Sequence, residues 1–332
     1  MRILVTGAAG FIGSYMVKAL VNRGNSVAPL DNFADYYSVS YKRLRVATLY
    51  QDPNQLQVID ISDKKAIRKA FSSFRPEYVI HLAAQAGVRL SPDQSDVYIS
   101  SNIGGFYNVL CCAEDFGVEG FLYASSSSVY GDSTPTPYSE SSLTLRPKSI
   151  YGVSKLTNEM FAEIQARKSN MRFRGLRFFT VYGPWGRPDM AYFRIVSAGL
   201  GQSSFSLFGD GKIKRDFTFI DDVVETSIRL LDDLTTRDKK FSDIVNIGGS
   251  RPLEMNYLIE LVQRQTQSII TVNKESPNPL DSAITMADQS YLISILGKQQ
   301  FTPLEDGVEK LITWAESKEI KQNLKGWIEN IK

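Results

Sequence analysis

The sequence predicts an α/β fold in which a doubly wound parallel sheet is followed by a smaller lobe of mixed structure. Short runs rich in β-branched residues alternate with longer amphipathic segments up to residue 183, as expected for parallel strands joined by helices. The first run ends in a glycine-rich turn, "GAAGFIG", and after residue 183 the regular spacing is lost. We therefore expect one domain over residues 1–183 and a substrate lobe over 184–332, with some chain crossing between them.

The predicted elements of the first domain follow one another in regular order. The strand-like runs are "RILVTG", "SVAPLD", "LQVIDI", "YVIHLAA", "FLYASSS" and "RFRGLRFFTVYG". Amphipathic segments near residues 11–24, 63–73, 101–116 and 152–169 predict helices on both faces of the sheet. In the second lobe the candidates are "FSLFG", "FTFIDDVVETSIRLL", "DIVNIGG" and "MNYLIELVQRQ".

The composition excludes several classes of protein. With 38 basic and 36 acidic residues spread along the chain, no basic stripe for nucleic acid is expected. No signal-peptide pattern or run of about 18 apolar residues is found, so we expect a cytoplasmic protein without a membrane partner. The only cysteines, Cys111 and Cys112, are adjacent in an apolar helical pattern, which predicts core packing rather than a disulfide or a metal site.

The glycine-rich turn predicts a dinucleotide-binding (Rossmann) domain. Gly7, Gly10 and Gly13 are three residues apart and a helix follows at once, so the backbone can approach a pyrophosphate at the helix N-terminus. A tight turn with nothing bound is the alternative. Asp31 at the end of the next strand decides for a ligand, because its carboxylate suits the adenosine ribose hydroxyls and repels a 2′-phosphate. We therefore expect NAD rather than NADP.

Two other polar residues near this turn each have a structural alternative. Asp60 follows the third strand and is placed to meet the adenine edge, although a helix N-cap ahead of "ISDKKAIRKAF" explains it as well. His81, the only histidine, lies in a strand-like run, which favours a buried, hydrogen-bonded residue over a catalytic one.

A tyrosine–lysine pair in "YGVSK" is the candidate catalytic centre. Tyr151 and Lys155 are four residues apart and share a helix face. A solvated surface pair is the alternative, but Ser126 lies at the end of a predicted strand, at the sheet edge where ligands bind in this architecture. A lysine ammonium favours the phenolate of a nearby tyrosine, and the serine can hydrogen-bond the same substrate oxygen.

The motifs together resemble a known family over almost the entire chain. They are "TGAAGFIGS", "DNFADYY", "HLAAQAGVR", "YASSSSVYG", "YGVSK", "RFFTVYGPWGRPDMA", "FGDGKIKRDFTFIDDVV", "NIGGSRP" and "TMAD". In this order they resemble the extended short-chain dehydrogenase/reductases and, more narrowly, the UDP-glucuronate 4-epimerases. The resemblance implies an NAD-dependent enzyme that oxidises a UDP-sugar at C4, lets the 4-keto sugar turn over and reduces its other face.

The resemblance also implies roles for individual residues. Tyr151 is the base, Lys155 is its partner and holds the nicotinamide ribose, and Ser126 is the third catalytic hydroxyl. Tyr151 and Lys155 also belong to the implied cofactor site, whose other members are Gly7, Gly10, Phe11, Ile12, Gly13, Asp31, Asn32, Asp60, Ile61, Leu82, Ala83 and Ala84.

The UDP end of the substrate is assigned to the second lobe. "SLFGDG" resembles the segment that flanks the uracil, around Leu207 and Phe208, and Arg215 matches the family's phosphate-binding arginine, whose planar fork suits a diphosphate. A surface-exposed Arg215 is the alternative. The loop "SPNPLD" around Asp281 departs from the family, which typically has a glycine and a glutamine there.

The serine run distinguishes the epimerases from related enzymes. Dehydratases have Asp-Glu at the two positions before "VYG", and UDP-glucuronate decarboxylases have Glu at the second. This chain has Ser127 and Ser128, which offer hydroxyls and no carboxyl group for acid–base chemistry. With Thr180 and Arg187 they are candidates to hold a C6 carboxylate, which keeps the 4-keto sugar from losing CO₂. The alternative is that both serines cap a strand end or pack against the nicotinamide.

The sequence thus predicts a UDP-glucuronate 4-epimerase, with Arg89 as a further candidate for a phosphate or carboxylate or else a surface residue. The alternatives are a 4-epimerase of neutral UDP-sugars, such as UDP-glucose or UDP-N-acetylglucosamine, and a non-catalytic NAD-binding regulatory protein. Apolar faces on the helices near 101–116 and 152–169, which form a four-helix bundle between subunits in relatives, predict a homodimer.

Overall fold

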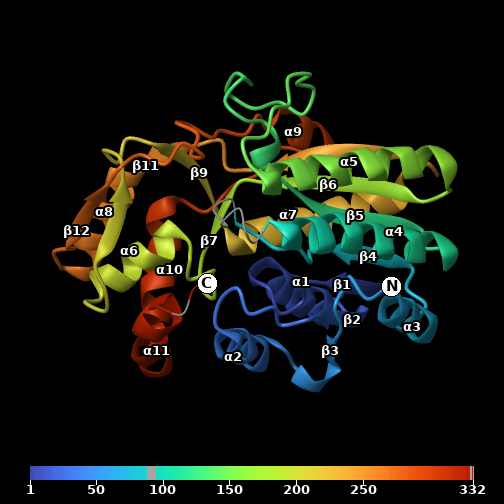
Figure 1. Cartoon of the computed structure of the whole chain (residues 1–332), viewed down its shortest axis with the longest axis horizontal. Coiled ribbons are helices and arrows are strands. Elements are labelled where there is room, and N and C mark those ends of the chain that lie inside the picture. The colour runs from blue at the N-terminus through green and yellow to red at the C-terminus, as the bar shows by residue number, and fades with distance from the viewer. Residues whose placement is uncertain (88–94, 330, 332) are drawn as a thin grey trace.

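The computed structural model describes residues 1–87, 95–329 and 331 and confirms the doubly wound parallel sheet (Figure 1). Seven parallel strands lie in the order β10-β6-β5-β4-β1-β2-β3. From β1 the chain adds strands first on one side of the sheet, as β2 and β3, and then on the other side from β4 onward. Ligands bind beside the point where the strand order switches in this way, here between β1 and β4. The strands are β1 (Arg2–Thr6), β2 (Ser26–Asp31), β3 (Gln57–Val58), β4 (Tyr78–His81), β5 (Gly120–Ser126), β6 (Arg172–Phe178) and β10 (Ser242–Ile247).

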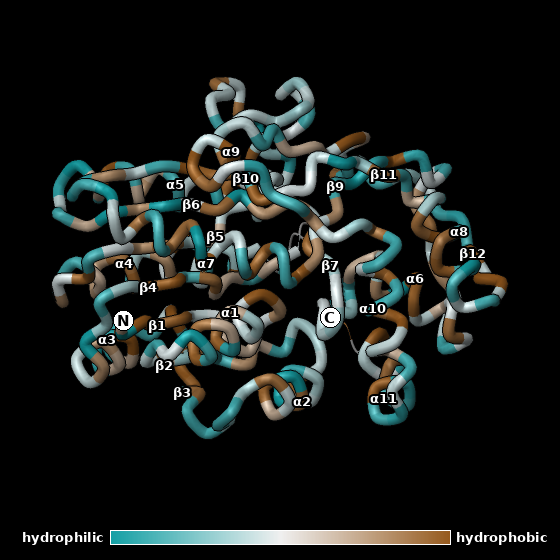
Figure 2. Tube along the Cα trace, turned by 180° about the vertical axis from the view of Figure 1, so that it is seen from behind, coloured by the Kyte–Doolittle hydropathy of each residue, from teal (hydrophilic) through white to brown (hydrophobic). Residues whose placement is uncertain are grey.

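Helices cover both faces of this sheet and enclose two hydrophobic clusters. One face packs on α3 (Lys64–Phe74), α4 (Phe106–Asp115) and α5 (Ile150–Lys168). The other face packs on α1 (Phe11–Asn22) and α7 (Ile220–Thr236), whose apolar residues continue into the core of the second lobe. Figure 2 shows the hydrophobic colour along the central strands β1 and β4. In the described part of the chain no helix combines the length and apolar composition needed to cross a membrane.

The second lobe has two small sheets, ordered β11-β9-β7 and β12-β8. It lies beside the large sheet (Figure 1), and the division at residue 183 stays a prediction, since β10 returns from the second half to the edge of the large sheet. Its elements are β7 (Thr180–Tyr182), α6 (Ala191–Gly199), β8 (Phe205–Phe208), β9 (Lys214–Phe219), β11 (Pro252–Glu254), α8 (Met255–Thr266), β12 (Val272–Glu275), α10 (Leu304–Glu316) and α11 (Lys318–Glu329), while α9 (Ser290–Leu296) contacts α7 and β10.

Within residues 1–183 the structure differs from the sequence prediction in four elements, and in the second lobe the helices α6, α9, α10 and α11 were not predicted. The run "RFRGLRFFTVYG" is two strands, because the chain leaves the large sheet at Phe179 and β7 then pairs with β9. The predicted third strand is reduced to the two residues of β3. The helix expected from residue 101 begins as a π-helix over Tyr98–Gly105 and continues as α4. A further helix, α2 (Val39–Leu49), was not predicted.

Candidate active site

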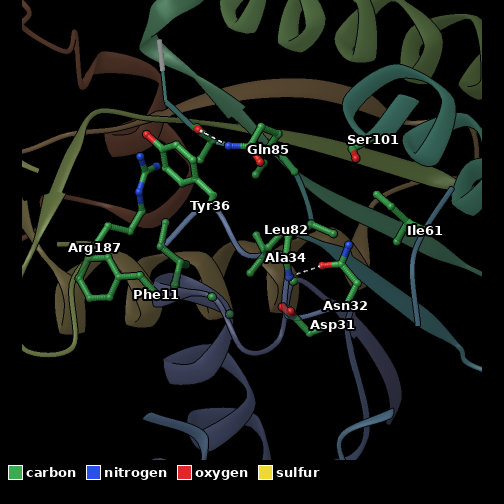
Figure 3. A pocket seen from close by; sticks show the side chains of 18 of the residues that line it. Phe11, Asp31, Asn32, Ala34, Tyr36, Ile61, Leu82, Gln85, Ser101 and Arg187 are labelled. Atoms are coloured by element: carbon green, nitrogen blue, oxygen red, sulfur yellow. Dashed lines mark hydrogen bonds between the residues drawn. The ribbon is translucent and has the colours of Figure 1, made fainter. Parts of the chain in front are cut away.

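A cavity of about 450 Å³ lies at the C-terminal edge of the large sheet, within the size range of ligand pockets. It is lined by every residue predicted to bind the cofactor, and Ser126 and Arg187 also line it. Figure 3 shows Asp31 and Asn32 in one part of the cavity and Tyr36 and Arg187 side by side in another. The cavity therefore joins the predicted cofactor and catalytic residues in one space.

The glycine-rich loop has a shape that only glycine permits. Gly7 has a positive φ of 70°, and a Cβ there would lie 2.6 Å from the Ala83 nitrogen. A Cβ on Gly13 would lie 2.1 Å from the Gly7 carbonyl oxygen. Gly10 is the N-cap of α1 and gives it no side-chain hydrogen bond, so the first amides of the helix face the cavity without a capping side chain. This cradle fits the diphosphate of NAD.

The two acidic residues beside the glycine-rich loop, Asp31 and Asp60, accept hydrogen bonds from neighbouring residues. Asp31 Oδ2 accepts a hydrogen bond from the Ala9 amide at 3.0 Å, and Oδ1 accepts one from the Phe33 amide at 2.7 Å. The Asp31 carboxylate therefore fixes the backbone of the glycine-rich loop, in addition to its predicted contact with the ribose. Asp60 accepts from Asn32 and Ser62, and these bonds lower its pKa although burial opposes them.

The alternative role of Asp60 as a helix cap is wrong. The N-cap of α3 is Asp63, whose side chain accepts hydrogen bonds from the Lys65 and Ala66 amides. Asp60 lines the cavity instead, at the position predicted for contact with the adenine.

Tyr151 and Lys155 lie on the first turns of α5 and both line the cavity. The Lys155 Nζ lies 5.8 Å from the centre of the Tyr151 ring and donates a hydrogen bond to the Ala124 carbonyl at 2.9 Å. Burial raises the pKa of Tyr151, while the charge of Arg187 and the hydroxyl of Ser126 act against this rise. Arg187 is thus a further cation that favours the phenolate, and the effect of Lys155 on Tyr151 stays a prediction.

Lys155 is almost completely buried, at 1% exposure. Burial lowers its pKa to about 8, and the Glu159 carboxylate one turn further along α5 opposes this effect. The burial that lowers this pKa disfavours the charged form of Lys155, and the Glu159 carboxylate partly offsets the effect.

Hydrogen bonds of Ser125, Ser126 and Ser128 hold the serine run in place. Ser125 donates to the buried Glu159 carboxylate, which Arg177 grips with two further bonds of 2.9 and 2.8 Å. Ser126 caps the 3₁₀ turn over Ser127–Val129, and its Oγ lies 3.1 Å from both the amide and the Oγ of Ser128. Linker-like flexibility is therefore excluded for this segment.

The candidate carboxylate-binding group is only partly assembled at the cavity. Arg187 lines it, whereas Ser127, Ser128 and Thr180, although described, are not part of its lining. Arg187 is paired with Asp189 through its Nε at 3.0 Å and through Nη2, and the Tyr36 hydroxyl donates to the same carboxylate at 3.3 Å. Its charge is therefore already compensated within the chain.

The predicted UDP-binding residues lie outside this cavity lining, in the second lobe. Arg215 Nη1 donates to the Ser282 carbonyl at 2.7 Å, and Nη2 lies 3.6 Å from the Asp281 carboxylate. The Arg215 side chain is only 16% exposed, so the surface alternative is wrong. Leu207 is buried and Phe208 half-buried on β8. Arg89 lies outside the described residues.

His81 is a buried structural residue, as predicted. Its Nδ1 lies 2.9 Å from the Thr6 hydroxyl, and its ring packs against Phe106 and Phe121. Burial, with a smaller effect of Lys155, lowers its pKa to about 3, so the imidazole is neutral at pH 7.

Some cavity residues were not predicted to have a role. Tyr36 and Tyr37 line the cavity from the segment after β2, Lys42 lines it from α2, and Gln85 lines it from the segment after β4. The motif "DNFADYY" contains the two tyrosines, so a signal was present in the sequence, but aromatic residues in a loop do not by themselves indicate a ligand.

Comparisons with known proteins agree with this geometry. The family model described as the NAD dependent epimerase/dehydratase family matches residues 3–248. UDP-glucuronate 4-epimerase 4 of Arabidopsis thaliana is 38% identical over 330 residues, covering 95% of this chain and 75% of the relative.

Two solved structures are similar over nearly the whole chain. The UDP-glucuronic acid 4-epimerase of Bacillus cereus, in complex with UDP-glucuronic acid and NAD, has a TM-score of 0.86 at 31% identity, with 97% of this chain and 99% of that one covered. The UDP-glucose 4-epimerase of Thermotoga maritima with UDP-glucose has a TM-score of 0.83 at 28% identity, with coverages of 95% and 98%.

Proposed function

The chain belongs to the NAD-dependent epimerase/dehydratase family, and from this premise we propose that it is an NAD-dependent 4-epimerase acting on UDP-glucuronate. The observation that carries the proposal is the single cavity in which the glycine-rich loop meets Ser126, Tyr151 and Lys155. The relatives named as UDP-glucuronate 4-epimerases support the choice of sugar. A non-catalytic NAD-binding protein would have no need of this side-chain set.

Each of the three residues has a defined task in the proposed reaction. The chemistry that NAD supplies when bound is reversible hydride transfer at C4 of the sugar. Tyr151 removes the proton of the 4-hydroxyl and later returns it, and Ser126 donates a hydrogen bond to the same oxygen. Lys155 holds the nicotinamide ribose, and its position between the Ala124 carbonyl and Tyr151 supports this role.

The serine run supports epimerisation over elimination or decarboxylation. Oxidation of glucuronate at C4 gives a β-keto acid, and the breaking bond to CO₂ must be kept out of line with the carbonyl π system. We assign this to hydroxyls of Ser127, Ser128 and Thr180 together with Arg187, because a carboxylate in a desolvated site is stabilised by several donors.

One observation favours a neutral UDP-sugar as the second candidate. Asp189 already pairs with Arg187, so a sugar carboxylate would have to share that guanidinium or displace Asp189. Arg187→Ala is therefore informative: it weakens binding of UDP-glucuronate much more than binding of UDP-glucose if Arg187 holds the carboxylate, and affects both alike if it does not.

Further proposals concern the surroundings of the site. The UDP moiety binds along β8 and β9, with Leu207 and Phe208 flanking the uracil and Arg215, beside Asp281, at the diphosphate. Arg89 is proposed only as a further anion ligand. The enzyme acts in the cytoplasm as a homodimer, and the exposed apolar residues of α5 and of the helix before it support the dimer.

The deciding experiment is a substrate panel. The purified full-length protein is incubated with UDP-glucuronate, UDP-glucose and UDP-N-acetylglucosamine, and the products are identified by NMR. We expect UDP-galacturonate from UDP-glucuronate without net NADH. Turnover of the neutral sugars alone would establish the second candidate, and NAD binding without any turnover would contradict both.

A further inference from the structure

Helix α2 carries a buried cation beneath the glycine-rich loop. Arg45 is fully buried, at 0% exposure, and its Nη1 donates a hydrogen bond of 2.7 Å to the Ala9 carbonyl within the loop. It does not line the cavity itself. A guanidinium stays protonated in proteins, so a full positive charge sits behind the backbone of the loop.

No acidic side chain of the described residues forms an ion pair with Arg45. Among the residues that the structure describes, no carboxylate oxygen lies within 4.0 Å of the Arg45 guanidinium. Its other contacts are the Tyr37 hydroxyl at 3.1 Å, the Tyr41 ring at 4.7 Å and, more weakly, the Gly186 carbonyl at 3.5 Å. All are uncharged groups, and the first turn of α2 contains no acidic residue.

The buried arginines elsewhere in the fold show how unusual this is. Arg174 is paired with Asp233 and Asp243, and Arg177 is paired with Glu159. A buried charge without a counter-ion is costly. Arg174 and Arg177 each have a carboxylate partner, whereas Arg45 has none within ion-pair distance in the described part of the chain. The low-dielectric surroundings also let the field of the cation reach across the loop.

The loop is held from the same side by an uncharged donor. Tyr50, the residue after α2, donates a hydrogen bond of 2.6 Å from its hydroxyl to the Ala8 carbonyl. Adjacent carbonyls of the loop are thus bound by one charged and one neutral side chain. The pair allows the effect of charge to be separated from the effect of holding the backbone.

We propose that Arg45 is the counter-charge of the dinucleotide diphosphate, acting through the glycine-rich loop as a positioning residue that never touches the ligand. The counter-ion that the protein itself does not supply is the diphosphate bound on the other side of the loop. This inference rests on the NAD site of the proposed function and is independent of which sugar the enzyme uses.

The test compares ligands that share the adenosine but differ in charge. Dissociation constants of NAD, ADP and adenosine are measured by titration calorimetry with the full-length protein and its variants. In Arg45→Met we expect the dissociation constants of NAD and ADP to rise by at least about tenfold, the size expected for losing one charge interaction, and that of adenosine to change less than about twofold. Tyr50→Phe, the matched control, changes ADP and adenosine binding by the same small factor.

Two results would overturn the inference. One is an equal loss of ADP and adenosine binding in Arg45→Met, which would mean that Arg45 only shapes the loop; the other is wild-type affinity for all three ligands. If Arg45→Met does not fold, Arg45→Lys decides, because it keeps the charge: we expect ADP binding within about threefold of wild type, and a loss as large as tenfold contradicts the proposal. Failure of the wild-type protein to bind NAD would instead contradict the proposed function.

Discussion

Tyr151 combines a half-buried side chain with nearby groups that favour its ionised form. Burial raises its pKa, and Arg187 and Ser126 oppose the rise. A tyrosine is already protonated at neutral pH at its ordinary pKa of about 10, and burial raises the pKa of Tyr151 further, so its action as a base depends on neighbouring groups that favour the phenolate. The residues around Tyr151 therefore decide whether it acts, and its substitution tests the chemistry directly.

Replacing Tyr151 with phenylalanine keeps the ring and removes the ionisable oxygen. We expect kcat to fall by about 10²–10⁴-fold, the usual loss of general acid–base catalysis, while folding and NAD binding persist. Stopped-assay NMR gives kcat and calorimetry gives the NAD affinity. Activity close to that of the wild type would assign the base to another residue.

Ser128 is the position at which a carboxyl group would change the fate of the 4-keto sugar. In Ser128→Glu we expect weaker binding of UDP-glucuronate, because like charges repel in a partly desolvated site. A larger share of turnover should then give the pentose nucleotide left after loss of CO₂, measured by NMR of the products. Ser128→Gln is the control of nearly equal size. If both variants give the same products, charge at this position does not control decarboxylation.

At the scale of elements, the strands and most helices of residues 1–183 follow from periodicity, but α2 does not. Its buried face includes Lys42 and Arg45 beside Tyr41, Val46 and Leu49, so the apolar stripe that marks a helix in sequence is interrupted by charge. The break at Phe179 is equally hidden, because the apolar run passes through it while the pairing changes from β5 to β9. The sequence pattern predicts which residues are buried, but it does not predict which strand or helix packs against them.

The sequence predicts which residues form the candidate site better than it predicts the contacts that their side chains make. Residues of the glycine-rich loop and α5 are recognised by spacing, because their task depends on backbone shape and on a shared helix face. The pairing of Arg187 with Asp189 and the capping of Ser127–Val129 by Ser126 depend on side-chain positions. Spacing alone does not determine such contacts.

Asp216 on β9 links three segments of the second lobe and predicts a pH effect. It is fully buried, and its Oδ2 accepts from the Ser250 amide at 3.0 Å and from the Ala287 amide at 2.9 Å. Burial raises its pKa from 3.8 to about 6, so the folded state binds a proton more tightly than the unfolded state. The resulting stabilisation is complete below about pH 4 and is lost as the pH rises through 6.

The measurement is the free energy of unfolding in denaturant between pH 4 and pH 7 for the wild type and Asp216→Asn. Because other carboxyl groups are common to both proteins, the wild type should lose about 2 kcal/mol relative to the variant over this range. A difference that does not vary with pH would show that Asp216 titrates normally.

At the scale of the whole molecule, several large apolar side chains are exposed on neighbouring helices. Val153, Met160 and Ile164 on α5 are between 47% and 58% exposed, and Ile99 and Tyr107 on the preceding helix are 55% and 51% exposed. Large exposed apolar residues concentrated on neighbouring helices are typical of a subunit interface. The proposed dimer would bury these faces against a second copy.

Sedimentation velocity at micromolar concentration checks this interface. We expect a dimer for the wild type and a 37.2 kDa monomer for the double variant Met160→Lys, Ile164→Lys. Ile269→Lys is the control, because Ile269 is 94% exposed but lies far along the chain in the second lobe. A monomeric wild type, or a dimer that survives the double substitution, would contradict the proposed contact.

The return of β10 to the edge of the large sheet also constrains how the protein can be made. During synthesis the strands β1 to β6 emerge first, and the outer edge of β6 stays unpaired until residue 247 has left the ribosome. Unpaired strand edges are prone to aggregate. A chain ending at residue 240 should therefore be insoluble on expression where the full chain is soluble, and the first domain can complete its sheet only after much of the second lobe has been translated.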